Sequence, residues 1–159
     1  MPVIRPLRRP GPHRGAAIAE FAILMPIILA LLVGIWEVGR MIEVQQMLSN
    51  AAREGGRQAS TGQFTNTQIQ QVVTQYLQVA GLPTGTVTVT VQDLTNASLD
   101  VSAANYLDRL QVTVTIRFQD VRWSLLSLVT DSSTTLTAQT IWITMVDKPY
   151  PIPPEPPVG

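Results

Sequence analysis

The chain carries two kinds of hydrophobic pattern. Residues 21–36 are uniformly apolar, whereas beyond residue 40 apolar residues recur first every three or four positions and then every second position. A spacing of three or four predicts an amphipathic helix, and strict alternation predicts a half-buried strand. The order of these patterns predicts a long N-terminal helix followed by a small domain of mixed secondary structure.

The uniformly apolar segment predicts a helix that spans a membrane. Phe21–Trp36 has sixteen residues, and its extension to 16–38 gives 23 residues, or roughly 35 Å of helix. A spanning helix needs about 20 residues, so the segment is long enough if Glu20 and Glu37 lie near the two interfaces. Pro26 falls inside it and predicts a kink, either incidental or useful for packing into an assembly.

A basic segment precedes the apolar one. The first fifteen residues carry four arginines and no acid, whereas residues 16–159 carry seven Lys and Arg against eleven Asp and Glu. The positive-inside rule places the N-terminus in the cytoplasm and everything from about Arg40 outside it, as in a single-pass protein of the inner (cytoplasmic) membrane. A cleavable secretory signal is the competing interpretation. It is disfavoured because Glu20 separates the basic and apolar parts and because no small-x-small cleavage site follows.

The helical spacing continues beyond the apolar segment to about residue 61. The residues at these intervals are Met41, Ile42, Gln45, Leu48, Ala52, Gly55 and Ala59. The small residues among positions 51–59 would allow close packing against a sheet or another helix. A second helix is predicted from Thr67 to Val79, with Thr65 or Asn66 as its cap and Gly81–Pro83 as its end.

Three further segments predict strands. Thr86–Val91 alternates Thr with Val, Leu110–Phe118 alternates with its apolar residues on one face, and Leu136–Val146 is the third. In the third, the apolar phase shifts between Ala138 and Ile141, which predicts a bulge or a change of buried face. Two helices followed by three or four antiparallel strands indicate an α+β fold with the sheet packed on the outer half of the long helix.

The patterns divide the chain into four parts. These are a basic cytoplasmic leader (1–15), a long transmembrane and amphipathic helix (16–61), an extracytoplasmic α+β domain (62–146) and a proline-rich tail (147–159). The tail has six prolines in thirteen residues and predicts polyproline II or disorder, either simply solvated or recognised by a partner.

One connection within the α+β domain leaves two alternatives open. Val121–Val129 is unusually apolar for a segment between strands. It is either a short buried helix that closes one end of the sheet, or an exposed apolar patch for the bilayer or a partner.

The sequence offers little for catalysis or metal binding. It has no cysteine, and its one histidine, His13, lies in the leader, so the folded part can form neither a thiolate site nor a Ser–His–acid triad. The aspartates fit turns and strand ends better than an acid–base pair: Asp93, Asp100, Asp108, Asp120, Asp131 and Asp147. We therefore expect no enzyme, no metal and no cofactor. The arginines beyond residue 40 are scattered, so we expect no nucleic-acid partner.

Three blocks of residues resemble a known family. They are Arg14-Gly-Ala-Ala-Ile-Ala-Glu-Phe-Ala-Ile-Leu-Met-Pro26, Gly34-Ile-Trp-Glu-Val-Gly-Arg40 and Asn50-Ala-Ala-Arg-Glu-Gly-Gly-Arg-Gln-Ala59. Together they are similar to the N-terminal signature of TadE-like proteins, minor pseudopilins of the tight-adherence (Flp, type IVb) pilus system. The first block also has the pattern of a type IV prepilin processing site, in which a glycine, four small or apolar residues, a glutamate and an aromatic residue precede an apolar helix.

The resemblance implies roles for the residues of this block. A membrane aspartic prepilin peptidase would cut after Gly15 and leave Ala16 as the new N-terminus, with Phe21 as the aromatic residue that follows Glu20. Glu20 would neutralise the amine of a neighbouring subunit's Ala16 and set the register of packed helices. A carboxylate this close to a membrane segment is costly and therefore a functional candidate. The alternative is that Glu20 only snorkels to the cytoplasmic interface of an uncut anchor.

The sequence leaves two functions open. The first is a minor pseudopilin in pilus assembly, whose partners are the prepilin peptidase, other pilins and pseudopilins, the assembly platform and the lipid bilayer. The second is an uncleaved single-pass membrane protein whose outer domain binds an envelope or cell-wall component. The major pilin of this system is much shorter and nearly all helix, so a globular outer domain favours a minor or assembly subunit.

Overall fold

The computed structural model describes residues 14–122 and 130–146. The described part contains two helices, α1 (Arg14–Ser60) and α2 (Asn66–Val79), and three strands, β1 (Thr88–Asp93), β2 (Arg109–Arg117) and β3 (Thr135–Ile143). It also contains three short 3₁₀ helices, η1 (Thr84–Thr86), η2 (Val101–Ala103) and η3 (Phe118–Asp120). The predicted α+β class is confirmed: a long N-terminal helix, a second helix and a three-stranded antiparallel sheet.

Some expectations fall outside the described residues. They concern most of the leader (1–13), most of the apolar connection (123–129) and the proline-rich tail (147–159). At the start of the connection, Val121 is buried and Arg122 is half-buried.

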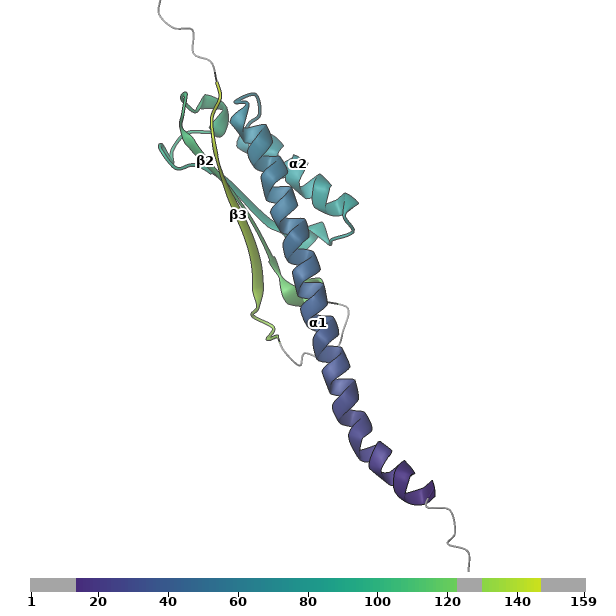
Figure 1. The fold of residues 1–159 in the computed structure, drawn as a ribbon. Helices are drawn as coiled ribbons and strands as arrows, with labels where there is room; N and C mark the ends of the chain where they lie inside the picture. The colour runs from purple at the N-terminus through teal and green to yellow at the C-terminus, as the bar shows by residue number, and fades with distance from the viewer. Residues whose placement is uncertain (1–13, 123–129, 147–159) are drawn as a thin grey trace, which may run out of the picture.

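Helix α1 is continuous over 47 residues, or roughly 70 Å. Figure 1 shows its N-terminal part projecting from the molecule, while its C-terminal part lies along the sheet with α2 beside it. We call residues 14–36 the free segment of α1 and residues 37–60 the packed segment. The helix runs through Pro26, and the kink expected there stays a prediction.

The packed segment approaches its neighbours closely because one face is made of small residues. Its buried residues include Val44, Leu48, Ala51, Ala52, Gly55, Gly56 and Ala59. A Cβ atom at Gly55 would lie 2.6 Å from Val73 Cγ2 of α2 and 3.2 Å from Val112 Cγ1 of β2. At Gly56 a Cβ atom would overlap the ring of Trp142 in β3. The absence of side chains at these two positions lets α1 touch both α2 and the sheet.

The sheet has the order β1-β2-β3, and one of its faces packs on the helices. Buried side chains on this face are Val91, Leu110, Val112, Val114, Ile116, Leu136 and Ala138. The alternation of β2 was therefore predicted correctly. The opposite face carries mainly Thr and Gln and is uncovered by any described element, as the strand alternation requires.

The expected bulge or change of face in β3 is wrong. β3 pairs with β2 in an unbroken register from Arg109↔Ile143 to Arg117↔Thr135. Trp142 keeps to the helix-facing side, where Gly56 leaves room for its ring. Ile141 is consequently placed on the uncovered face with Ile143, so the shift in apolar phase reflects exposed isoleucines.

The start of one strand and the buried face of α1 also differ from expectation. β1 begins at Thr88, two residues later than predicted, because Thr84–Thr86 form η1. In α1, Ile42 is exposed and Val44 is fully buried, although only Ile42 was assigned to the apolar face.

Helix α2 begins as its sequence predicts. The Thr65 hydroxyl accepts from the N–H of Gln68, and the Gln68 side chain accepts from the N–H of Thr65 at 2.9 Å, which forms a capping box. Its buried residues Ile69, Val73 and Leu77 face the core. The reciprocal cap fixes where the helix starts and therefore which side it turns to the core.

Candidate functional site

The large apolar side chains of the free segment are exposed among the residues that the structure describes. Phe21 is 55% and Trp36 is 62% exposed. No part of the most apolar window of eighteen residues is buried, and the helix is long and apolar enough to cross a membrane. A soluble monomer rarely exposes a continuous apolar surface of this size. The free segment is therefore a candidate single-pass membrane anchor.

The residues of the predicted processing site lie in the first turns of α1. Gly15 and Glu20 are exposed, and a Cβ atom at Gly15 would have no neighbour within 4 Å. Nothing in the described fold therefore requires glycine at this position. The three ion pairs among the described side chains do not include Glu20. The structure places Gly15, Ala16, Glu20 and Phe21 on one continuous helix, and whether the chain is cut there stays a prediction.

Two charged residues, Glu37 and Arg40, lie at the start of the packed segment of α1. We call this pair and its contacts the neck. Glu37 is only 2% and Arg40 only 8% exposed. The hydroxyl of Thr130 donates to Glu37 Oε1, and Arg40 Nε donates to the carbonyl of Val121 at 3.0 Å. Arg40 Nη1 also donates to Glu43 Oε2 at 2.8 Å. Buried charges need such partners because desolvation is costly.

The neck links α1 to both ends of the connection between η3 and β3. Val121 is the C-cap of η3, and Thr130 lies shortly before β3. The sequence indicates that Glu37 lies near one end of the spanning segment, but it does not reveal these contacts. The spacing of Glu37 and Arg40 was the available signal, because residues three apart share one side of a helix.

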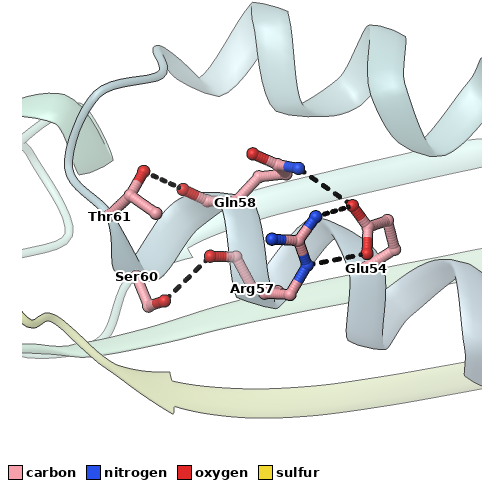
Figure 2. A network of polar contacts seen from close by, with 5 residues as sticks. All are labelled: Glu54, Arg57, Gln58, Ser60 and Thr61. Carbon is pink, nitrogen blue, oxygen red and sulfur yellow. Dashed lines mark hydrogen bonds and ion pairs between the residues drawn. The ribbon is translucent and has the colours of Figure 1, made fainter.

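A polar network closes the opposite end of α1 (Figure 2). Arg57 donates to both carboxylate oxygens of Glu54, at 2.6 and 3.0 Å, and Gln58 Nε2 donates to the same carboxylate at 2.9 Å. Hydrogen bonds from Arg57 and Gln58 lower the pKa of Glu54. The hydroxyls of Ser60 and Thr61 donate to the carbonyls of Arg57 and Gln58, at 2.8 and 2.7 Å. They add partners to carbonyls of the last helical turn, of which the Gln58 carbonyl also accepts from the N–H of Thr61 at 3.2 Å.

The aspartates act in turns, as their positions predicted. Each described one accepts from a nearby group: Asp93 from Thr95 N, Asp100 from Ser102 N, Asp108 from Asn105 N, Asp120 from Arg117 Nε and Asp131 from Ser132 N. Asp147 lies outside the described residues. Within residues 14–122 and 130–146, no group of three His, Cys, Asp or Glu side chains is placed to hold a metal ion.

Asp100 also joins two elements. Its carboxylate accepts from the N–H of Asn66 at 3.1 Å, and the Asn66 side chain accepts from the N–H of Val101 at 3.2 Å. Burial raises the pKa of Asp100, but hydrogen bonds from Ser102 and Asn66 together lower it further, so the net shift is downward. This reciprocal contact holds the start of α2 against η2.

Comparison with known proteins finds one similarity, and it covers the N-terminal part of the chain. Residues 15–57 match the family model described as TadE-like protein. No curated protein and no solved structure gave a match to the chain. The matched range starts at Gly15 and covers the free segment, the neck and most of the packed segment, but neither α2 nor the sheet. Residues 15–57 of this protein are therefore similar to TadE-like proteins, a family associated with tight-adherence pili.

Proposed function

We propose that this protein is a minor pseudopilin that takes part in assembly of a tight-adherence (Flp, type IVb) pilus. A prepilin peptidase would cut after Gly15, and the mature chain would pack with other pilins and pseudopilins through the free segment of α1. One observation carries this proposal. The helix that matches the TadE-like model from residue 15 onward is long and apolar enough to cross a membrane, and no part of its most apolar window of eighteen residues is buried.

The proposed topology follows from charge. Four arginines precede Ala16, so the N-terminus would remain in the cytoplasm and α1 would cross the inner membrane. The sheet and α2 would then form the extracytoplasmic domain, and the leader would end at residue 15. The pilus assembly platform and the lipid bilayer would be the immediate surroundings of the free segment.

Glu20 would set the register between neighbouring subunits. In an environment of low dielectric constant an unpaired carboxylate is heavily penalised, whereas a pair of opposite charges offsets much of that cost. Cleavage would create an amine at Ala16, four residues from Glu20. Neighbours packed in the wrong register would leave both charges unpaired, so the pair would select one arrangement.

The neck would couple the packing of the free segments to the orientation of the extracytoplasmic domain. Glu37 and Arg40 lie on α1 itself and hold residues on either side of the connection before β3. The domain is thereby fixed around the helix axis. Packing of the free segments would consequently also orient the extracytoplasmic domains.

The first experiment is N-terminal sequencing and intact mass measurement of the protein from membranes of its own host. We expect a chain that begins at Ala16, and a full-length chain when the peptidase is deleted. Gly15→Leu should block cleavage without disturbing the fold, because the position has open space around it. A chain that keeps its leader while the peptidase is active would overturn the proposal. It would favour an uncleaved anchor whose outer domain binds an envelope or cell-wall component.

A further inference from the structure

The outer edge of β3 presents main-chain groups to the surroundings. Hydrogen bonds from Phe118 N to Thr134 O (2.8 Å) and from Thr144 N to Asp108 O (3.0 Å) extend the ladder with β2 at both ends. The register therefore pairs even-numbered residues of β3 with β2 through hydrogen bonds. Since bonded and non-bonded pairs alternate in an antiparallel ladder, the odd-numbered residues direct their N–H and C=O groups away from β2.

Two hydrogen bonds join α1 to this edge, one near each end of β3. Gln45 Nε2 donates to the carbonyl of Thr137 at 2.9 Å, and Met145 N donates to the carbonyl of Ser60 at 2.9 Å. Between these contacts, no hydrogen bond links the outward groups of residues 139, 141 and 143 to any described residue. We call residues 139–143 the open edge.

The open edge lacks the features that usually protect a free strand. β3 contains no charged residue and no proline, and its register has no bulge. Natural proteins use such features to stop free edges from pairing with other chains. By contrast, β1 on the other side of the sheet is shorter, and Gln70 of α2 donates to the Val89 carbonyl at 3.1 Å.

The side chains beside the open edge are apolar and accessible. Ile141 is 44% and Ile143 is 49% exposed, and both lie on the uncovered face of the sheet. A row of main-chain groups without partners among the described residues, flanked by exposed isoleucines, favours a partner that adds a strand. A partner that only packs side chains on this surface would leave those main-chain groups without hydrogen bonds. Main-chain bonds would supply affinity, and alternate side chains would supply selectivity.

We propose that the open edge binds an extended strand supplied by a different protein. The strand continues the sheet beyond β3 through hydrogen bonds to residues 139, 141 and 143. Its side chains on the uncovered face lie next to Ile141 and Ile143, so apolar or β-branched residues fit best there.

A second copy of this chain does not fit the same edge by antiparallel pairing. The contacts Gln45–Thr137 and Ser60–Met145 occur in the same order along both elements, so α1 and β3 run in the same direction. Two copies of β3 paired antiparallel would point their α1 helices in opposite directions. Both free segments could not then enter one membrane, whereas a strand from another protein has no such constraint.

Binding is tested on the full-length protein in lipid nanodiscs with a defined peptide. The probe is a labelled peptide with the sequence of residues 109–117, because β3 already accepts that strand on its inner edge. We expect saturable binding. Ile141→Pro removes an outward N–H but no bond to β2, and should weaken binding at least about tenfold. Ile141→Thr keeps the N–H and loses only apolar contact, so it should weaken binding much less than Ile141→Pro does. No saturable binding, or equal binding by Ile141→Pro, overturns the proposal.

If Ile141→Pro fails to fold, peptides with methylated amides test the same main-chain hydrogen bonds on the wild-type protein. N-methyl groups on one alternate set of peptide amides should abolish binding, while methyl groups on the other set should not, because only one edge of the peptide faces β3. Equal effects of the two sets overturn the proposal.

A cross-linking experiment in host membranes identifies the source of the strand. A photoreactive residue at Gln139 should give one discrete adduct with another protein, and the adduct should disappear when Ile141→Pro is added. The same group at Thr113, on the uncovered face of the central strand, is the control and should give none. The chain has no cysteine of its own, so Ile141→Cys reports self-pairing directly. A disulfide-linked homodimer would overturn the proposal of a different protein.

Discussion

The Thr130 hydroxyl donates a hydrogen bond to the Glu37 carboxylate across 93 positions of sequence. Both side chains are buried. Glu37 lies at the beginning of the packed segment, and Thr130 lies before β3. The contact therefore joins the helix to the segment that leads into β3, at the point where the apolar free segment ends.

Thr130→Val should destabilise the fold, because it keeps the shape of the side chain and removes the donor. Loss of a partner for the buried Glu37 carboxylate should lower the free energy of unfolding by about 1–3 kcal/mol. Urea unfolding in detergent micelles, followed by tryptophan fluorescence, measures the change. Thr90→Val, at an exposed position of β1, is the control and should change it by less than about 0.5 kcal/mol. Equal effects of the two substitutions would contradict the role of the contact.

Two glycines of α1 should respond to alanine in opposite directions. A Cβ atom at Gly39 has no neighbour within 4 Å, so Gly39→Ala should raise the free energy of unfolding by up to about 1 kcal/mol through helix propensity. A Cβ atom at Gly55 would lie 2.6 Å from Val73 Cγ2, so Gly55→Ala should lower that free energy by about 1–3 kcal/mol. Thermal unfolding of the two variants provides the comparison. A stabilised Gly55→Ala protein would show that α1 does not approach α2 this closely.

Glu20→Ala should permit processing and impair pilus assembly, since it removes the charge that we propose pairs with a neighbouring Ala16. N-terminal sequencing measures processing, and electron microscopy of the host measures the number of pili. Glu20→Gln keeps the size of the side chain without its charge and should impair assembly to a similar degree. Normal pilus numbers in Glu20→Ala would rule out the register role.

Acid should weaken the junction between α2 and η2. The pKa of Asp100 is lower in the folded protein than its ordinary value of 3.8. Such a carboxylate stabilises the fold above its unfolded-state pKa, and its contribution is lost as the pH falls through the folded-state pKa. The free energy of unfolding should therefore decline below about pH 4. Urea unfolding at several pH values should show a shallower decline for Asp100→Asn, and identical slopes would refute the assignment.

Leu107→Gly should stabilise the protein. Leu107 has a φ of 67°, a conformation in which a Cβ atom is disfavoured, and its side chain is exposed. Its N–H donates to the Thr144 carbonyl at 3.3 Å, and glycine preserves this bond. The free energy of unfolding should rise by roughly 0.5–1 kcal/mol. Tyr106→Gly, at the exposed neighbour without a positive φ, should lower it instead, and chemical unfolding of both variants distinguishes the two effects.

Local patterns were enough to predict the elements of the fold. Alternation located β2 because its apolar residues all face the core, and the Thr65–Gln68 capping box marks the start of α2. The long apolar run located α1, and its small residues indicated a close approach to other elements. These features depend on neighbours within a few positions, which a single sequence contains.

Contacts between residues that are distant in the sequence could not be predicted from local patterns. Met41, Ile42 and Val44 are all apolar, and their spacing does not decide which of them faces the core. The neck contacts at Glu37 and Arg40 fix the rotation of α1, and that rotation buries Val44. In β3, the space beside Gly56 keeps Trp142 on the helix side, which the sequence of β3 alone does not reveal. Cleavage after Gly15 is a chemical event between two proteins, so it stays a prediction.

Helix α1 is continuous from its free segment to its packed segment, so a tilt of the free segment also moves the packed segment. The packed segment is 24 residues long, or roughly 36 Å. A tilt of the free segment by about 10° would carry Ser60 through roughly 6 Å at this length. Bilayer thickness and the packing of neighbouring helices determine the tilt of a spanning helix. They would thereby also determine how far above the membrane, and at what angle, the open edge of β3 meets its partner.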